Sequence, residues 1–558
     1  MKKCRTPLSL ILGLCLVFSC KNLQNQVSSP TSTEPATGKK GMVSSAHPLA
    51  TQAGLDILKT GGNAFDAAVA VAAVLNVVEP AMSGMGGYGT IIIYDSEKGR
   101  ARFLNPSSRI PGAVDSDVYR APTPNHLENR RGAKAVSTPG NVHAWEAMSM
   151  EYGQLKWERL FTPAIHLAEN GFEINASLSH LIQRAFSSFP EHAQAFYGQN
   201  RKSLKEGENL IQKDLAHSLQ LIAKEGASVF YEGEIGEAID KTMKKAHGFL
   251  SIQDLKEDRA EWWEPISIRY HGCEVITASP PSTAFPSLIR LGMMSQFDAQ
   301  KLEHNSAEYL HRFAEVTKHA FWCRLAYAGD PDFTPPPLDR LLSKSYWEKA
   351  VQKIDLDKAH PFEYPEISEN KDSHTTHFAV ADQWGNIVCA TQTLGNAFGS
   401  RIMPKGTGIW LNNSLAYCTF EPKGNPMDAH AGHHKLSGDC PTLILKDDKP
   451  WAALGTPGGH TIGQTVPQMV MNLIDFNMNI QKAINAPRVS FIEPNYLAVE
   501  KGIPQAVQEK LRQLGHDVRE VQSLGNAHGL TIRYNTQGKP IKFLGGSDSR
   551  GEGLAGGF

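Results

Sequence analysis

The sequence predicts a mixed α/β protein, on three observations. Residues 140–355 have a mainly helical pattern broken by Pro and Gly, whereas the chain from Thr375 onward is rich in strand-like segments. Residues 64–78 contain many Ala and Val residues, which suits a helix packed closely within a core. The 558-residue chain is 41% hydrophobic and 20% charged, as an ordinary globular protein is. Its net charge of -1 gives no reason to expect nucleic acid as a partner.

The N-terminus has the pattern of an export signal. Three basic residues within the first five positions precede an apolar run over residues 8–18, which is too short to span a bilayer. The run leads into Cys20 in a pattern that resembles a bacterial lipobox, so we expect Cys20 to be lipidated. The protein would then be exported and anchored in the periplasm or cell envelope. The alternative is a plain secretory signal with a chance cysteine.

The signal is followed by a segment rich in Ser, Thr, Pro, Asn and Gln, which predicts a flexible tether over residues 21–40. The five cysteines beyond it have no close paired spacing and indicate buried thiols, not a disulfide framework. Ordered structure is expected from Gly41.

Two helices are expected at the start of the ordered part. Residues 48–59 form the first, which ends at a Gly-Gly turn. Asn63 caps the second, residues 64–78, and Asp66 is its capping-box-like partner.

A glycine-rich loop over residues 83–89 leads into an apolar strand over residues 90–95. Its glycines match G-x-G-x-x-G, but a dinucleotide site requires the order strand, loop, helix. Here the order is helix, loop, strand, so we expect no nucleotide cofactor and no cofactor of another kind.

The sharpest chemical feature is a polar segment that runs directly into an alternating strand at Thr375. The strand turns around Trp384, and this turn places Thr375 opposite Thr393 in the hairpin. A threonine hydroxyl needs a base, and cleavage of the peptide bond after His374 would supply one as the new α-amine of Thr375. That amine has an ordinary pKa of about 7.7–8.0. An ordinary Thr-rich hairpin is the alternative.

A second feature is a strand over residues 451–454 that leads into Gly458, Gly459 and a helix from about His460. Two consecutive backbone N–H groups at a helix N-terminus can stabilise the oxyanion of a tetrahedral intermediate. A plain strand-to-helix turn is the alternative.

Several separated motifs resemble the γ-glutamyltransferase family, and together they extend from about residue 40 to the C-terminus. They are the segment Thr-Thr-His-Phe at 375–378 with Asp382 and Gly385-Asn386, Gly61 to Ala68, residues 83–87, 411–413, 457–459, 485–488 and 547–550. The resemblance implies a four-layer αββα sandwich of the N-terminal-nucleophile (Ntn) hydrolase type.

The resemblance also implies autocleavage between His374 and Thr375. The larger subunit would comprise residues 41–374 with the preceding tether, the smaller one residues 375–558, and the two would remain a heterodimer. Thr375 matches the family nucleophile and Thr393 the threonine that supports it. Gly458 and Gly459 match the oxyanion pair.

The residues that hold the glutamyl head in the family are largely replaced. Ser107 lies at the position of the carboxylate-binding Arg, with Arg109 two residues on, where a strand would place both side chains on one face. Tyr417 replaces the Asp that binds the α-amine, and Ser437-Gly438 replace the paired serines. Ser414, after the Asn-Asn pair, completes the set of predicted substrate-binding residues.

These replacements leave three interpretations open. The first is an enzyme that cleaves γ-glutamyl amides such as glutathione, with water or an amine as acceptor. The second is an acylase for glutaryl-type or other amides without an α-amine, which Tyr417 would suit. The third is an uncleaved, inactive surface lipoprotein that binds a small molecule. His430, His433 and His434 could be metal ligands, but their segment has a loop pattern, so we expect no metal site.

Overall fold

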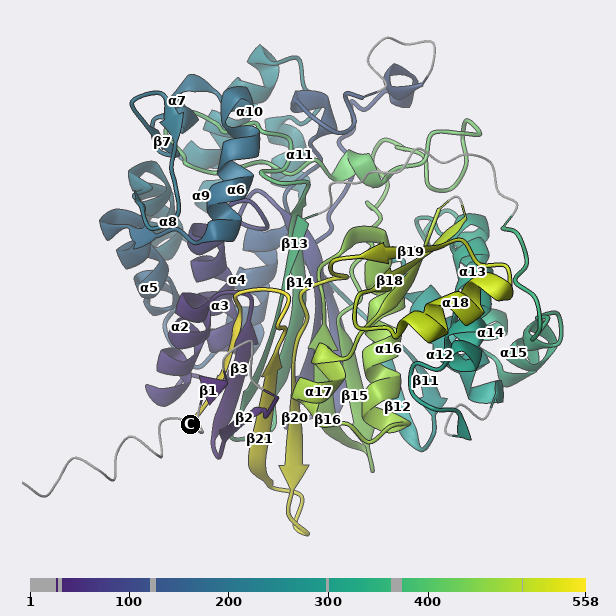
Figure 1. Ribbon diagram of the computed structural model, residues 1–558. Coiled ribbons are helices and arrows are strands. Elements are labelled where there is room, and N and C mark those ends of the chain that lie inside the picture. The colour runs from purple at the N-terminus through teal and green to yellow at the C-terminus, as the bar shows by residue number, and fades with distance from the viewer. Residues whose placement is uncertain (1–26, 29–32, 121–126, 298–300, 363–373, 494) are drawn as a thin grey trace, which may run out of the picture.

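Two antiparallel sheets lie face to face at the centre of the computed structural model, and helices cover the outer face of each (Figure 1). This arrangement confirms the predicted four-layer αββα sandwich. The structure describes residues 27–28, 33–120, 127–297, 301–362, 374–493 and 495–558. The predicted signal and Cys20 lie outside the described residues.

The first sheet has eight strands and combines segments from before and after Thr375. In spatial order the strands are β1 (Val27–Ser28), β22 (Leu554–Gly557), β3 (Gly41–Ser45), β13 (His374–Asp382), β14 (Ile387–Gly395), β4 (Tyr88–Asp95), β5 (Arg100–Asn105) and β10 (Glu261–Trp263). Strands β4 and β14 are buried along their whole length because both of their faces are covered.

The second sheet has seven strands. In spatial order they are β11 (Ile266–Tyr270), β12 (Cys273–Thr277), β15 (Thr442–Lys446), β16 (Lys449–Gly455), β20 (His528–Tyr534), β21 (Pro540–Ser547) and β2 (Ala36–Gly38). Three smaller sheets lie outside the sandwich. They comprise β17 (Val489–Ile492), β18 (Tyr496–Glu500) and β19 (Val518–Val521); β6 (Phe172–Glu173) and β9 (Asn209–Leu210); and β7 (Gly198–Gln199) and β8 (Lys202–Ser203).

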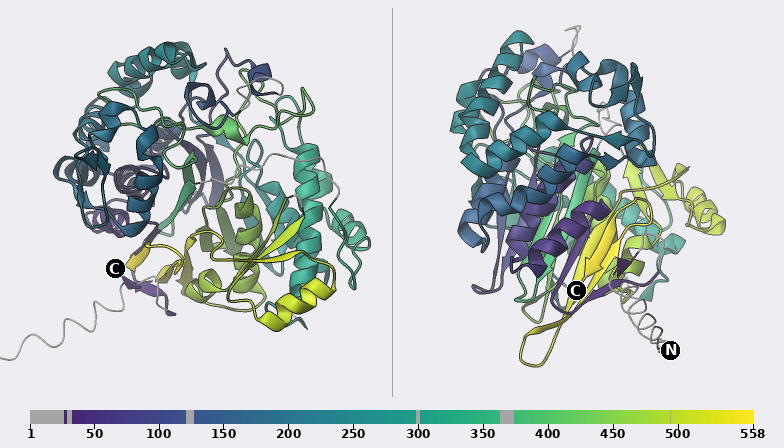
Figure 2. Two further views of the ribbon diagram at one scale, coloured as in Figure 1. Left: turned by 45° about the horizontal axis from the view of Figure 1, so that its top comes forward. Right: turned by 90° about the vertical axis from the view of Figure 1, so that its left-hand side faces the viewer.

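The helices divide between the two outer layers, as the views from two sides show (Figure 2). The first sheet is covered by α2 (Pro48–Lys59), α3 (Ala64–Val78), α4 (Asn141–Tyr152), α5 (Trp157–Asn170), α6 (Ala176–Ala185), α7 (Glu191–Gln194), α8 (Lys213–Glu225), α9 (Ser228–Tyr231), α10 (Glu234–Lys245) and α11 (Ile252–Glu257). The second is covered by α12 (Phe285–Met294), α13 (Ala307–Tyr327), α14 (Leu338–Leu341), α15 (Lys344–Val351), α16 (Ile462–Ile474), α17 (Ile480–Asn485) and α18 (Gln505–Gln513).

Alternation along β13 distributes its side chains between two cores. Phe378 and Val380 pack into the core beneath the first helix layer, whereas Ala379 and Ala381 belong to the core between the sheets. Thr375 has the same parity as Ala379, and it therefore lies on the inner face of the first sheet.

Both early helices have the predicted bounds, and Asn63 and Asp66 form the predicted capping box. Two expectations differ from the structure. The region 140–355 also contains β10, β11 and β12, whose short alternating pattern the surrounding helices obscure. Residues 36–38, placed in the tether by sequence, form β2 because they pair with β21 at the edge of the second sheet. Within the described ranges, no helix combines the length and apolarity needed to cross a membrane.

Candidate active site

The hairpin of β13 and β14 has the register that the sequence predicts. Thr375 lies directly opposite Thr393, and the pairing continues in step to Ala381 opposite Ile387. Asp382 stabilises the turn, because its Oδ1 accepts hydrogen bonds from the backbone N–H groups of Trp384 and Asn386. Both threonines are buried, with exposures of 3% and 2%.

A short chain of hydrogen bonds links the two threonines to the preceding peptide bond. Thr375 Oγ1 donates to Thr393 Oγ1 at 3.2 Å, and Thr393 Oγ1 donates to the carbonyl oxygen of His374 at 2.6 Å. The backbone N–H of Gly395 donates to Thr393 Oγ1 at 2.7 Å and orients it. The chain therefore ends on the carbonyl of the bond that the sequence predicts to be cleaved.

Close packing between the sheets brings the glycine loop toward this hairpin. A Cβ on Gly455, the last residue of β16, would lie 2.4 Å from the ring of His377, so only glycine fits there. His377 is on the same strand face as Thr375, two residues on. Gly455 in turn precedes Gly458 by three residues.

Gly458 and Gly459 have φ values of 140° and 57°, which residues with a side chain rarely adopt. They lead into the 3-10 turn η7 (Gly459–Thr461) and then α16. Successive N–H groups at such a helix N-terminus form a concave donor site suited to an anion. The local geometry thus supports the sequence-based expectation for this pair, which stays a prediction.

The predicted acyl-binding residues gather next to this loop. Tyr417, in the 3-10 turn η6 (Ser414–Tyr417), lies with its ring centroid 5.6 Å from that of His460. A Cβ on Gly438 would come within 3.2 Å of the Tyr417 ring. Ser437 Oγ accepts a hydrogen bond from Thr90 Oγ1 of β4 at 3.3 Å, while Ser414 Oγ is buried without a partner among the described residues.

Ser107 and Arg109 do not form the predicted pair on one strand face. Strand β5 ends at Asn105 and Ser108 has φ 63°, so the alternation behind that expectation is absent. Ser107 Oγ donates to the carbonyl oxygen of Gly89 at 2.9 Å. The Arg109 side chain is 47% exposed and forms an ion pair with Glu261 at 3.3 Å.

Three further polar residues, which sequence reasoning missed, occupy the same area. Lys435 and Asp439 flank Ser437 and Gly438, and Tyr88 lies opposite Thr393 in the first sheet. All three are buried, and Lys435 Nζ, Asp439 Oδ2 and Tyr88 Oη have no hydrogen-bond partner among the described residues. Burial lowers the pKa of Lys435 and raises that of Asp439 to about 7. The sequence could have indicated two of these residues, because Lys435 and Asp439 are charged and flank the predicted substrate-binding pair Ser437 and Gly438.

Glu79 is a carboxylate on the other side of the nucleophile. Its backbone N–H donates to the carbonyl oxygen of Leu75 at the end of α3, and its side chain accepts a hydrogen bond from Thr376 Oγ1 at 2.7 Å. Burial raises its pKa to about 7.

In the histidine-rich segment, both ring nitrogens of His434 contact carboxylates. His434 Nδ1 and Nε2 lie 3.1 Å from Asp330 and 2.9 Å from Glu261. Burial lowers the pKa of His434, but the hydrogen bonds to these two carboxylates outweigh it and raise the pKa to about 9. Asp330, Asp332 and His434 have the spacing of metal ligands.

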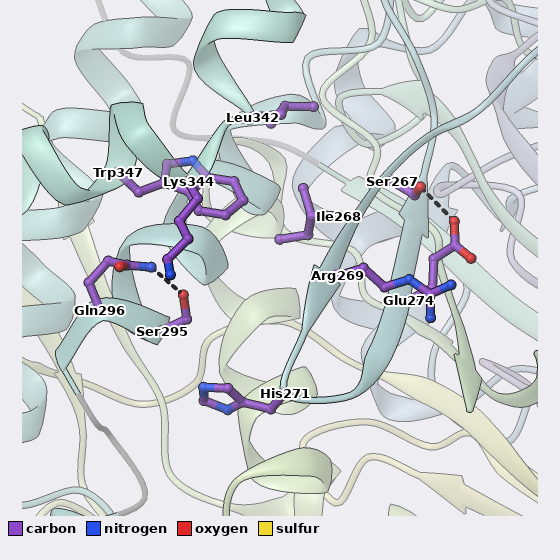
Figure 3. Close-up of a pocket in the computed structure, with 10 residues that line it drawn as sticks. All are labelled: Ser267, Ile268, Arg269, His271, Glu274, Ser295, Gln296, Leu342, Lys344 and Trp347. Atoms are coloured by element: carbon purple, nitrogen blue, oxygen red, sulfur yellow. Dashed lines mark hydrogen bonds between the residues drawn. The ribbon is translucent and has the colours of Figure 1, made fainter. Parts of the chain in front are cut away.

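Two cavities differ in their relation to the candidate site. One of about 280 Å³ adjoins His374 and is lined by four arginines, at positions 130, 131, 184 and 401. A larger one of about 950 Å³ lies at the far edge of the second sheet, between β11 and α15 (Figure 3). It contains none of the predicted site residues. In this cavity Lys344 and His271 lie well apart, and the hydrogen bonds drawn join only neighbouring polar side chains.

Comparison with known proteins gives a consistent family relationship. The gamma-glutamyltranspeptidase family model matches residues 50–558. A glutathione hydrolase proenzyme of Bacillus subtilis (strain 168) is 34% identical over 524 residues, which cover 88% of each chain. The acylase ACY 1 proenzyme of Pseudomonas sp. (strain SE83) is 35% identical over 520 residues, covering 90% of this chain and 92% of the relative.

Among solved structures, the cephalosporin acylase from Bacillus halodurans is similar over the whole sandwich. The TM-score is 0.86 at 28% identity, and the match covers 95% of this chain and 98% of that one. Relatives named for hydrolysis of glutathione and relatives named as acylases are thus comparably similar to this chain.

Proposed function

Because this chain belongs to the γ-glutamyltranspeptidase family, we propose that it is a self-cleaving threonine amidohydrolase and acyltransferase with Thr375 as its nucleophile. The observation that carries the proposal is the hydrogen-bond chain from Thr375 Oγ1 through Thr393 Oγ1 to the carbonyl oxygen of His374. It joins the proposed nucleophile to the carbonyl group that it would attack.

In the cleavage step, Thr375 Oγ1 attacks the carbonyl carbon of His374. Negative charge develops on the His374 oxygen, where the Thr393 hydroxyl already donates a hydrogen bond. The C–N bond breaks, the hydroxyl proton passes to the amine nitrogen, and an ester remains on Thr375. Water then hydrolyses the ester, which leaves a carboxylate on His374 and a free α-amine on Thr375.

The two products would remain one heterodimer. Strand β3 of the larger piece lies between β22 and β13 of the smaller piece, and β4 pairs with β14. In the second sheet, β12 pairs with β15 and β2 with β21. Breaking one peptide bond leaves all of these ladders intact.

In turnover, the α-amine of Thr375 serves as the base for its own hydroxyl. The hydroxyl attacks the substrate amide, and the N–H groups of Gly458 and Gly459 stabilise the oxyanion. The amine of the substrate leaves with a proton. Water or a second amine then attacks the acyl-enzyme and regenerates Thr375.

Two acyl groups are candidates, the γ-glutamyl group and a glutaryl-type group without an α-amine. The second is favoured by the acyl-binding residues. Tyr417, whose ring lies beside that of His460, offers no carboxylate to an α-ammonium, and Arg109 is engaged with Glu261. The strong similarity to an acylase proenzyme is compatible with this substrate class.

The test is intact-mass analysis of protein lacking residues 1–20, beside its Thr375→Ala variant. We expect two fragments that break between His374 and Thr375 in the wild type and one unbroken chain in the variant. Only the cleaved protein should hydrolyse acyl anilides. An unbroken, inactive chain in both would support the alternative of an uncleaved ligand-binding lipoprotein.

We also propose that Cys20 carries a lipid anchor. The support is the sequence pattern alone, since Cys20 lies outside the described residues. Full-length protein expressed in a bacterium should fractionate with membranes and carry the added mass of a lipid on Cys20. A Cys20→Ala variant that remains membrane-bound would contradict the proposal.

A further inference from the structure

Lys435 has a fully buried amino group without a hydrogen-bond partner among the described residues. Its exposure is 0%, and none of the three donors on Nζ is used. Two aromatic rings lie near it, with Nζ 2.9 Å from the ring centroid of Tyr88 and 5.9 Å from that of Tyr417. Aromatic faces attract a cation, but they do not replace the hydrogen bonds that it had in water.

The position of Tyr88 relates this cation to the proposed nucleophile. Thr375, Thr393 and Tyr88 form one row across β13, β14 and β4, and directly opposed residues share a face of the sheet. Neighbouring strands are about 4.8 Å apart, so Tyr88 is roughly 10 Å from Thr375 along this row. Lys435 therefore faces the same inner surface as Thr375, at a distance that a short acyl chain can span.

On these observations, and resting on the proposed function, we propose that Lys435 Nζ binds the terminal carboxylate of the acyl group. The substrates would be amides of short diacids, of which a glutaryl amide is the simplest. With C–C bonds of about 1.5 Å, the two carboxyl carbons of such an acid are roughly 5 Å apart. The substrate must also reach from Oγ1 to its carbonyl carbon and from Nζ to its carboxylate, and the total length is then comparable with the roughly 10 Å of the row.

Asp439 does not form an ion pair with Lys435. Asp439 Oδ2 is buried and also unpartnered among the described residues, so the two groups form no closed salt bridge. They are near enough to influence each other, because each side chain shifts the pKa of the other toward the charged form. A substrate carboxylate that reaches Lys435 could thus contact it without first breaking an ion pair.

The place of the substrate is taken by the chain itself before cleavage. The carbonyl of His374 accepts the hydrogen bond from Thr393 before cleavage, so the segment that ends at His374 must move away before a substrate can approach Thr375. The cleaved heterodimer is therefore the form in which turnover of substrates should be measured.

The test compares glutaryl p-nitroanilide with pentanoyl p-nitroanilide, which has the same chain length without the carboxylate. We expect the wild-type protein to favour the glutaryl substrate by about 100-fold in kcat/KM, since one buried charge pair commonly contributes that much. In Lys435→Met this ratio should fall to near one, mainly through KM. A structural role alone would lower both activities and leave their ratio unchanged.

Two further variants control for loss of folding and for buried charge. Lys435→Met combined with Asp439→Asn removes both charges, and its ratio should fall as far as that of the single variant. Lys446, on β15, is an exposed cation whose Nζ lies 5.3 Å from the ring centroid of Trp451. The Lys446→Met variant should keep the wild-type ratio. A wild-type ratio near one, or a ratio that survives in both Lys435 variants, would overturn the proposal.

Failure of the proposed function gives a different result. The wild type would then remain uncleaved or hydrolyse neither anilide. In that case glutarate binding is measured by thermal shift: stabilisation of the wild type but not of Lys435→Met, with none by pentanoate, would still support the carboxylate site. Equal responses to glutarate in both proteins would refute it.

Discussion

The two sides of the proposed active site satisfy their polar groups in opposite ways. The nucleophile side, formed by Thr375, Thr393 and the carbonyl of His374, consists of neutral groups joined in one hydrogen-bond chain. The acyl side, formed by Tyr88, Tyr417, Lys435 and Asp439, contains buried polar atoms without hydrogen-bond partners among the described residues, namely Tyr88 Oη, Lys435 Nζ and Asp439 Oδ2. The first side is satisfied within the protein, whereas the second offers the unpaired atoms to which we propose that a substrate carboxylate binds.

This difference follows from how each side is built. The nucleophile side depends on backbone register, because two opposed strand positions place the hydroxyls together. The acyl side depends on side chains from loops and strand ends that come together only in the folded protein. One substitution can therefore rewrite the acyl side while the chemistry next to it is retained.

The largest expected effect breaks the hydrogen-bond chain on the nucleophile side. Thr393→Val keeps the shape of the side chain but removes the donor to the carbonyl oxygen of His374. Loss of one oxyanion donor typically costs about 100- to 1000-fold in rate, so cleavage followed by gel or mass analysis should slow by that factor. Thr393→Ser retains the hydroxyl and should be cleaved at close to the wild-type rate. Equal rates for the two variants would show that the hydroxyl chain has no catalytic part.

A second prediction concerns the carboxylate of Glu79, which makes the nucleophile side less neutral at high pH. Its pKa is raised from 4.5 to about 7, so protonated Glu79 favours folding below pH 4.5. This contribution is lost as the pH rises through about 7. The Glu79→Gln variant has no carboxylate and does not lose this contribution. As the pH rises from 4.5 to above 7, its free energy of unfolding should therefore increase relative to that of the parent by up to about 3 kcal/mol.

The comparison is best made in the uncleaved Thr375→Ala background, where each protein is a single chain. Urea unfolding of both proteins at several pH values gives the difference directly. A difference that does not change with pH would show that Glu79 has an ordinary pKa in the folded protein.

A third prediction sharpens the character of the acyl side. Glutaryl p-nitroanilide should exceed γ-glutamyl p-nitroanilide by about 10- to 100-fold in kcat/KM, since an uncompensated α-ammonium is costly to bury. Tyr417→Asp supplies a carboxylate beside Gly438 and should shift the ratio toward the γ-glutamyl substrate. Tyr417→Phe is the matched control, because it keeps the ring and adds no charge. Preference of the wild type for the γ-glutamyl substrate would contradict this prediction and would show that the protein cleaves γ-glutamyl amides.

The sequence was most informative where neighbouring residues determine the structure. Asn63 and Asp66 predicted the start of α3, and the turn at Trp384 predicted that Thr375 lies opposite Thr393. Both arrangements depend on local hydrogen bonds and on the strict alternation of a strand. No such rule connects Lys435 with Tyr88, because that contact arises from a loop of one sheet that reaches the strand end of the other.

Arg109 shows why the acyl side was harder to predict. Its assignment assumed an extended strand through Ser107, but Ser108 has a positive φ. Such a conformation is uncommon for a residue other than glycine, so the sequence did not predict it. The chain turns there, and Arg109 reaches Glu261 instead of the inner face of the sheet.

The smallest expected effect tests this reassignment of Arg109. Its side chain is 47% exposed, and exposed ion pairs are worth about 0–1 kcal/mol. Arg109→Ala should therefore change kcat/KM for glutaryl p-nitroanilide by less than about fivefold, whereas Lys435→Met should change it far more. A loss with Arg109→Ala that equals the loss with Lys435→Met would mean that Arg109 leaves Glu261 to bind substrate. The cation that binds the substrate carboxylate would then be Arg109, which would move in from the surface after cleavage. The acyl side would no longer differ from the nucleophile side in having unpaired polar groups that bind the substrate.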